Sequence, residues 1–264
     1  MILNMINLLN LSLYMSDIPK EFDGNYYDQD YFQTPEGKKY RDAGGLTHAW
    51  SYANPTGEFL GAGPVAKAWK EVFEPRNLLD VGAGRGTFIA YARDAGIEAE
   101  GFDYSEWAVS DEGRYPRCKA EWLKLHDATE SWPYEDKSSD LVVALDFFEH
   151  IYEDDIDFVK GELYRVSSKY IFLQIAVSGT GGLQGRDEAG YFLNKGEKVP
   201  DGLEGCAVAG HVTVQTEKWW LDRLEHDDWI IRRDLKEHFI GVTGEDIIRN
   251  WLLNSILVYE RMGD

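Results

Sequence analysis

Residues 77–105, which read NLLDVGAGRGTFIAYARDAGIEAEGFDYS, constrain the fold of this chain more than any other stretch. A short apolar run leads into three closely spaced glycines, a helical pattern follows, and a second apolar segment ends in an acidic residue. Strand, glycine turn, helix and strand in that order begin a parallel sheet, and such sheets bind ligands at the carboxyl ends of their strands. The sequence therefore predicts an α/β domain with a nucleotide-like ligand at this turn.

The alternation of strand and helix continues along the chain. The predicted strands lie within residues 78–82, 98–105, 118–128, 139–151, 167–177, 228–238 and 254–262. The predicted helices lie within residues 63–73, 87–96, 107–114, 154–166 and 216–227. This order favours a Rossmann-like, seven-stranded, mostly parallel sheet with helices on both faces, and the last two strands are expected to form a terminal antiparallel hairpin.

Three segments lie outside this regular pattern. Residues 1–14 are apolar but too short to span a bilayer, and they lack the features of a signal peptide, so we expect a mobile or non-native extension. Residues 15–62 are rich in Tyr, Asp and Gly and are predicted to form an N-terminal aromatic cap. Within the main domain, residues 63–264, the glycine-rich residues 178–210 are predicted to be a lid or a substrate-shaping insertion.

The charge balance argues against nucleic acid as a partner. Lys and Arg number 27 against 47 Asp and Glu, a formal net charge of -20, which repels a phosphate backbone over most of the surface. The two cysteines, Cys118 and Cys206, lie far apart and belong to no CxxC or Cys/His cluster, so neither a disulfide framework nor a zinc site is predicted. We expect a cytoplasmic protein that binds no membrane.

The spacing of the glycines narrows the choice of ligand. Gly82, Gly84 and Gly86 read G-x-G-x-G, whereas the dinucleotide-binding pattern G-x-G-x-x-G needs a glycine where this chain has Thr87. A phosphate-binding P-loop needs Gly-Lys-Ser/Thr, which this turn lacks. Glycine also recurs in tight turns for backbone reasons alone, so the residues around the turn must decide.

Acidic residues follow the neighbouring strands. Asp103 ends the second strand, where its two oxygens can accept hydrogen bonds from both ribose hydroxyls of an adenosine. Asp127 lies on the loop after the next strand, where a carboxylate can accept from the adenine amino group. Residues 146–151, DFFEHI, end the fourth strand and face the same crevice. Together they favour a ligand that contains adenosine.

Four segments, in order, resemble motifs of the class I S-adenosylmethionine-dependent methyltransferases. The resemblance is to the branch that methylates small molecules (methyltransferase type 11/12/23-like). They read DVGAGRG, GFDYS, DATESWPYEDKSSDLVVALDFFEH and GHVTVQTEKWWLDRLEHDDW. The resemblance implies a methyltransferase domain over residues 63–264, S-adenosylmethionine as cofactor, and methyl transfer to a polar small molecule, an oxygen of a sugar or another metabolite. Residues 178–210, which would contact this acceptor, have no counterpart in the pattern.

The resemblance also assigns cofactor contacts. Those near the methionine part would come from Asp80, Gly82, Gly84, Gly86, Asp146 and Phe147. Those near the adenosine would come from Asp103 at the ribose, Tyr104 beside the adenine, and Asp127 with Ala128 at the adenine edge. Carboxylates at the rim complement the ammonium and sulfonium charges of the cofactor. The structural alternatives are turn capping for Asp103, turn formation for Asp127, and core packing for Tyr104 and Phe147.

A hydroxyl acceptor must lose a proton, and histidine is the side chain best suited to accept it near neutral pH. His211, where the insertion re-enters the fold, and His150, after the fourth strand, are therefore the candidate catalytic residues. Packing is the alternative role for His150. Asp146 and Glu149 offer two carboxylates but no evident third ligand, so no metal is predicted.

Three tyrosines of the cap, Tyr26, Tyr27 and Tyr31, are expected either to face the cofactor and acceptor or to form a satellite hydrophobic cluster. The expected partner is a small-molecule acceptor, and the expected assembly is a monomer or a homodimer. Two other functions stay open. One is a methyltransferase that acts on a protein or nucleic-acid site, and the other is a non-catalytic cofactor-binding sensor or assembly module.

Overall fold

The computed structural model describes residues 21–179, 190–247 and 255–263. The predicted extension, residues 1–14, and the middle of the predicted insertion, residues 180–189, lie outside the described residues. In the described part of the chain, no helix has the length and apolar character needed to cross a membrane.

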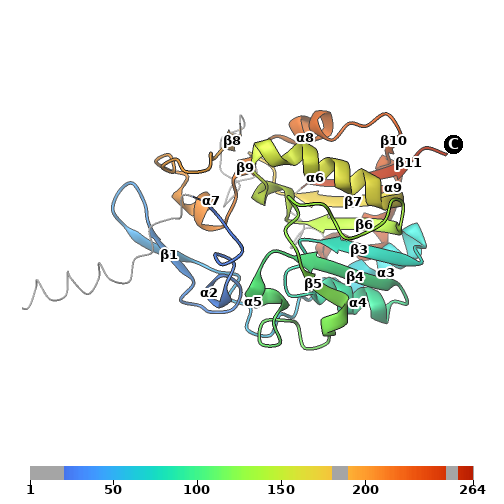
Figure 1. Cartoon of the computed structure of the whole chain (residues 1–264), viewed down its shortest axis with the longest axis horizontal. Helices are drawn as coiled ribbons and strands as arrows, with labels where there is room; N and C mark the ends of the chain where they lie inside the picture. The colour runs from blue at the N-terminus through green and yellow to red at the C-terminus, as the bar shows by residue number, and fades with distance from the viewer. Residues whose placement is uncertain (1–20, 180–189, 248–254, 264) are drawn as a thin grey trace, which may run out of the picture.

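Seven strands form one sheet in the order β10-β11-β7-β6-β3-β4-β5 (Figure 1). Their bounds are β3 Asn77–Val81, β4 Glu98–Asp103, β5 Leu123–Leu125, β6 Ser139–Leu145, β7 Ser167–Ile175, β10 Trp229–Ile231 and β11 Ser255–Arg261. The strands β3 to β7 run parallel, β11 pairs antiparallel with β7, and β10 pairs antiparallel with β11. The predicted sheet and its antiparallel final pair are confirmed, with a helix between the last two strands.

Helices cover both faces of the sheet. One face carries α3 Ala62–Phe73, α4 Thr87–Asp94 and α9 Arg233–Thr243, and the other carries α6 Glu153–Val166 and α8 Glu217–Arg223. The sequence of β3 explains this arrangement, because side chains alternate across a strand. Leu78 packs with the first set of helices and Leu79 with the second, and both are fully buried or nearly so.

The prediction of a strand over residues 228–238 is wrong beyond its first residues. Only Trp229–Ile231 is extended, as β10, and helix α9 begins at Arg233. Leu235 and Phe239 are four positions apart and pack together on the α3 face of the sheet, which is the spacing of one helix face. The β-branched start of the segment masks this helical pattern in the sequence.

The helix predicted at residues 107–114 is much shorter in the structure. Helix α5 covers Glu106–Val109, and Ser110 is already extended. Gly113 then approaches the Trp107 carbonyl so closely that an added Cβ would lie 1.9 Å from its oxygen. The chain folds back over the helix at this point instead of continuing it.

The described cap and the described end of the insertion form one layer beside the sheet (Figure 1). The elements are α2 Gln29–Phe32, β1 Lys38–Arg41, β2 Thr47–Trp50, β8 Tyr191–Phe192, α7 Glu204–Val208 and β9 Thr213–Val214. Helix α7 lies against β1. The hydroxyls of Tyr26 and Tyr31 donate to the carbonyls of Val208 and Ala209, at 2.6 and 2.8 Å. These bonds fix the cap to the segment that carries His211.

Candidate functional site

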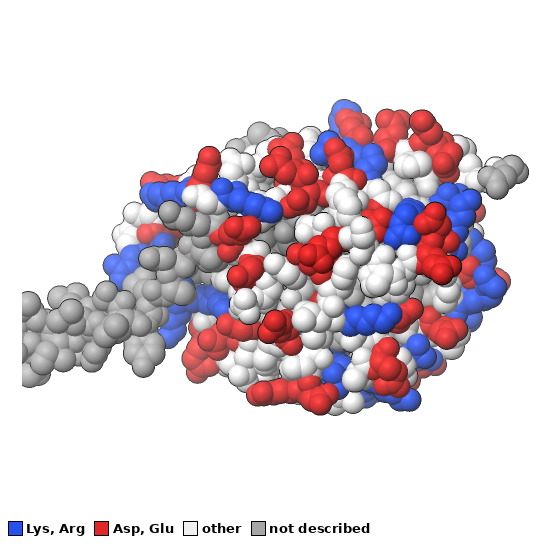
Figure 2. All heavy atoms as spheres, in the orientation of Figure 1, with Lys and Arg blue, Asp and Glu red and all other residues white. Residues whose placement is uncertain are grey.

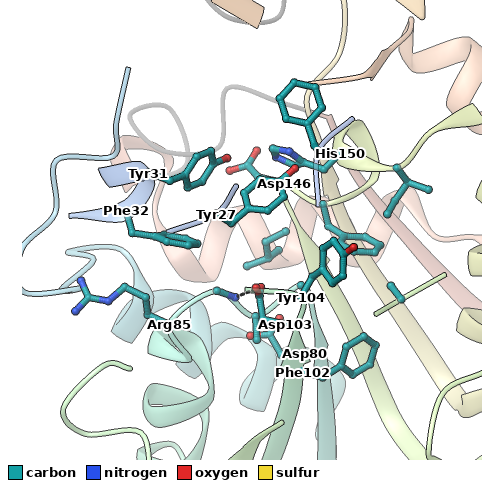
Figure 3. Close-up of a pocket in the computed structure, with 18 of the residues that line it drawn as sticks. Tyr27, Tyr31, Phe32, Asp80, Arg85, Phe102, Asp103, Tyr104, Asp146 and His150 are labelled. Carbon is teal, nitrogen blue, oxygen red and sulfur yellow. Dashed lines mark hydrogen bonds between the residues drawn. The ribbon is translucent and has the colours of Figure 1, made fainter. Parts of the chain in front are cut away.

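A pocket of about 530 Å³ lies at the carboxyl ends of β3, β4 and β6. The chain continues from β3 to β4 on one side and places β6 on the other, and open α/β sheets bind ligands at such a switch point. The volume is in the range of small-molecule sites. Figure 3 shows Asp80 and Asp103 at one end of the pocket and Asp146 and His150 at the other, where Tyr27 and Tyr31 lie beside them.

The glycine turn after β3 forms the floor of the pocket. Gly82 has a φ of 69°, and an added Cβ would lie 2.4 Å from a ring carbon of Phe147, so a side chain has neither the backbone conformation nor the space. The amide of Gly84 donates to Asp103 Oδ2 at 2.7 Å, which ties the turn to β4. Gly86 does not line the pocket. Its Cβ position faces the core, 2.6 Å from Cys118 Sγ.

The carboxyls of Asp80 and Asp103 stand next to this turn. Asp103 accepts a second backbone hydrogen bond, from Ser105 to Oδ1 at 2.8 Å, and each carboxylate oxygen keeps a lone pair for a ligand. Asp80 is only 2% exposed, and its Oδ2 has no hydrogen-bond partner. Burial, and secondarily the charge of Asp103, raises the pKa of Asp80 well above its usual range. Burial also raises the pKa of Asp103.

The predicted adenine-binding residues lie beyond Asp103 on the same side. Tyr104, Asp127 and Ala128 all line the pocket. Asp127 Oδ1 accepts hydrogen bonds from both the amide and the hydroxyl of Thr129 at 2.8 Å. Asp127 therefore forms a turn, which was the alternative role predicted for it. A turn-forming carboxylate still presents its second oxygen and the loop amides to a ligand.

Two acidic residues stand at the opposite end of the pocket, Asp146 in its wall and Glu149 behind the wall. Asp146 follows β6 in a left-handed backbone conformation, with a φ of 46°, and its Oδ1 accepts from the Gln174 amide at 2.7 Å. The 3-10 helix η2, Phe148–His150, comes next and turns Glu149 into the interior, where it is 0% exposed. Burial and the neighbouring Asp146 raise the pKa of Glu149 well above its usual range.

The two candidate catalytic histidines meet at this same end. His150 and His211 both line the pocket, with ring centroids 5.0 Å apart and planes at 86°. His150 Nδ1 lies 3.0 Å from the Gly210 carbonyl, so this nitrogen carries the proton and donates it. Burial, and then the proximity of His211, holds the pKa of His150 well below its usual range, which keeps the ring neutral.

The aromatic cap contributes part of the pocket wall. Tyr27 and Tyr31 line the pocket, whereas Tyr26 packs against them from outside its wall, with ring centroids 5.5 and 6.0 Å away. Burial raises the pKa of both pocket tyrosines well above the usual range, so their hydroxyls stay protonated.

Sequence reasoning missed several other residues of the wall. Trp50 ends β2, Tyr52 follows two positions later, and their ring centroids lie 5.2 Å apart. Arg85 projects from the glycine turn and donates to the Asn54 carbonyl at 2.7 Å, which joins the turn to the cap. The many aromatic residues of the cap were the sequence signal that could have identified Trp50 and Tyr52 as pocket residues. No pattern in the sequence marks Arg85.

Acidic side chains outnumber basic ones on the surface in Figure 2. On the face in Figure 2, Asp and Glu side chains are spread over the described residues, and Lys and Arg lie between them in small groups. This distribution fits the formal net charge of -20. It gives a phosphate backbone no continuous positive track on that face.

Comparison with protein families matches residues 50–157 to the methyltransferase domain Methyltransf_23. The matched range contains the glycine turn, the Asp103 strand end and the residues that follow β6. No curated protein matches the chain in sequence.

Solved methyltransferase structures share the fold. The plantazolicin methyltransferase BpumL, in complex with a triazolic desmethylPZN analog and SAH, has a TM-score of 0.54 at 14% identity, covering 78% of this chain and 87% of that chain. The plantazolicin methyltransferase BamL, also in complex with such an analog and SAH, has a TM-score of 0.51 at 15% identity, covering 78% and 86%. Residues 50–157 thus match a methyltransferase domain, and the described residues have the fold of class I S-adenosylmethionine-dependent methyltransferases.

Proposed function

We propose that this methyltransferase acts on an oxygen of a polar small molecule. One observation carries the proposal: a single pocket joins carboxylates suited to adenosine with two adjacent histidines under an aromatic cap. Donor and acceptor must meet in one cavity, because methyl transfer is an in-line displacement that depends on alignment. The SAH complexes of BpumL and BamL also hold desmethylPZN analogs, which supports an organic small molecule as the acceptor.

In this proposal the cofactor lies along the carboxyl ends of β3 and β4. The ribose hydroxyls donate to Asp103, and the adenine packs beside Tyr104 with its edge at Asp127 and Ala128. The methionine part passes over the turn at Gly82, where the absence of a side chain leaves room for it.

The charged end of the cofactor then reaches the buried carboxyls. Its ammonium group pairs with Asp80, Phe147 borders the turn at Gly82, and Asp146 lies farther along the pocket toward the histidines. Gly84 supports the site by bonding to Asp103, and Gly86 supports it from the core side by allowing α4 to start next to Cys118. The methyl group is thereby directed toward the histidine end of the pocket.

The acceptor occupies the space between the tyrosines of the cap and the two histidines. Its oxygen attacks the methyl carbon in line with the carbon–sulfur bond, the electron pair of that bond passes to sulfur, and S-adenosylhomocysteine leaves. The hydroxyl proton departs at the polar end, where His150 and His211 are the candidate acceptors. The cap, residues 15–62, and the insertion, residues 178–210, determine which acceptor fits.

Asp80 gives this placement a pH-dependent test. We expect S-adenosylhomocysteine to bind more tightly as pH rises, with release of a proton. Burial and Asp103 keep Asp80 protonated in the free protein at a pH where an exposed aspartate is charged. The cofactor's ammonium favours the charged form, so the pKa falls on binding, and affinity grows until the pH exceeds the pKa of the free protein. Calorimetry in two buffers with different ionisation enthalpies measures the proton released.

The matched control for this experiment is Asp80→Asn, which keeps the shape of the side chain but cannot ionise. Its affinity for S-adenosylhomocysteine is expected to be weaker than that of the wild type at high pH, with little proton release. Proton uptake by the wild type, or equal proton release by both proteins, would show that the ammonium group does not meet Asp80.

The acceptor class is tested with S-adenosylmethionine labelled in its methyl group. The full chain is incubated with separate pools of sugars, hydroxylated metabolites, RNA, DNA and protein, and each pool is assayed for label. We expect label in a small molecule, as a methyl ether. Label in a macromolecule would favour the protein or nucleic-acid alternative. Stabilisation by S-adenosylhomocysteine without transfer to any pool would favour the sensor.

A further inference from the structure

The polar end of the pocket contains more ligating groups than a proton acceptor needs. Glu149, His150 and His211 offer ligand atoms that lie within 4.8 Å of one another, and the Asp146 carboxyl neighbours Glu149. Imidazole nitrogens and carboxylate oxygens together suit divalent first-row transition metals. We propose that this cluster binds one such ion, and that the ion holds and activates the oxygen of the methyl acceptor.

Glu149 supplies the first argument. Its side chain is fully buried, and Oε1 accepts only a long hydrogen bond, from the Ala176 amide at 3.3 Å. Oε2 has no hydrogen-bond partner among the described residues, and the side chain that does interact with Glu149 is that of another acid, Asp146. A buried carboxylate oxygen without a partner costs free energy. A cation beside Oε2 would satisfy this oxygen and offset the repulsion between the two acids.

His150 is oriented as a metal ligand requires. Its Nδ1–H donates to the Gly210 carbonyl at 3.0 Å, and the neutral ring therefore has its lone pair on Nε2. Metal-binding histidines characteristically donate their other ring N–H to a carbonyl or carboxylate, which fixes the ring. The contact is close, because a Cβ added to Gly210 would lie 2.9 Å from Nδ1.

Hydrogen bonds hold the two ligand-bearing segments together. The Val212 amide donates to the Glu149 carbonyl at 2.8 Å, and the Thr213 hydroxyl donates to the Ile151 carbonyl at 2.7 Å. Ligands about 2.1 Å from one ion are at most about 4.2 Å apart. Three ligands around one ion lie closer still, at about 3 to 4 Å, so the cluster, whose ligand atoms lie within 4.8 Å of one another, reaches this geometry by side-chain shifts of about 1 Å.

The cluster is open on the side where the acceptor would bind. Asp146, His150 and His211 line the pocket, while Glu149 stands behind them, so an ion here keeps a coordination position facing the cavity. An acceptor hydroxyl bound at that position loses its proton to water more easily, because the ion stabilises the alkoxide. Only this second step rests on the proposed function, and ion binding itself does not depend on it.

The inference departs from the expectation of no metal, which followed from finding two carboxylates without a third ligand in the sequence. The two histidine ligands come from the fold. His150 turns toward Gly210, and His211 arrives from the far end of the insertion.

The test is a titration of the full chain with MnCl2 after removal of metals with a chelator. Calorimetry and the loss of the free Mn²⁺ electron paramagnetic resonance signal measure binding without any cofactor. We expect one Mn²⁺ per chain, and affinities lowered by about tenfold or more in Glu149→Gln and in His211→Asn. Glu106→Gln and His238→Asn remove the same kinds of group from exposed positions on α5 and α9, and they are expected to bind as the wild type does.

Thermal stabilisation by S-adenosylhomocysteine shows that each variant is folded. If Glu149→Gln or His211→Asn does not fold, His150→Gln is tested in its place. The absence of one-to-one binding by the wild type, or wild-type affinity in either ligand variant, overturns the metal site. Failure of S-adenosylhomocysteine to stabilise even the wild type overturns the proposed function instead, and circular dichroism then reports folding. In the transfer assay, a chelator should abolish turnover and Mn²⁺ should restore it, whereas direct proton transfer to histidine predicts no effect.

Discussion

Asp103→Ala should weaken the binding of S-adenosylhomocysteine by about 100-fold or more. The carboxylate is the proposed acceptor of two ribose hydroxyls, and each hydrogen bond to a charged group contributes about 1.5 to 3 kcal/mol. The same carboxylate also accepts the Gly84 and Ser105 amides at 2.7 and 2.8 Å, so its loss loosens the glycine turn that carries the methionine part. Isothermal titration calorimetry at fixed pH measures the change.

Two controls separate ribose binding from general damage. Glu106→Ala removes an exposed carboxylate three positions away and should leave the affinity unchanged. Asp103→Asn keeps one acceptor oxygen and the size of the side chain, so its affinity should fall between those of Asp103→Ala and the wild type. Wild-type affinity in a folded Asp103→Ala protein would place the ribose elsewhere.

His211→Ala should lower kcat for methyl transfer by about 100- to 1000-fold while the affinity for S-adenosylhomocysteine stays close to that of the wild type. Loss of a positioned proton-transfer group typically lowers the rate by a factor of this size. His211 lies at the polar end of the pocket beside His150, away from Asp103 and the adenine loop. Steady-state kinetics on the acceptor found in the labelled-methyl assay, together with calorimetry, separates the two effects.

His238→Ala is the matched control, because this histidine is exposed on α9 and does not line the pocket. Its kcat should equal that of the wild type. A wild-type kcat in His211→Ala would remove His211 from catalysis, both as a proton acceptor and as a metal ligand. A loss of cofactor affinity as large as the loss of kcat would assign it a structural role instead.

The sheet was predictable because its signals are local. The segment SDLVVAL of β6 and the run before the glycine turn are apolar over a strand's length, and each is followed by a helical pattern. Helix α9 escaped prediction because the β-branched residues of Trp229–Ile231 run directly into it, and the position of its buried Phe239 becomes evident only against the sheet.

The cofactor end of the site was also visible in the sequence, since Asp80, Asp103 and Asp127 each lie at or just after a strand of one parallel sheet. Their convergence follows from the topology. The other end depends on long-range backbone bonds, such as the one from Val212 to Glu149, that no periodicity encodes. The sequence singled out His150 and His211 separately, but their contact is a product of how the insertion re-enters the fold.

The most direct test is a crystal structure of the full chain with S-adenosylhomocysteine bound. The account predicts the ribose hydroxyls on Asp103, the ammonium group at Asp80, and the sulfur directed toward the cluster of Asp146, His150 and His211 under the aromatic cap. A cofactor bound in reverse, with its adenine at the histidines, or a sulfur directed away from this cluster, would contradict it.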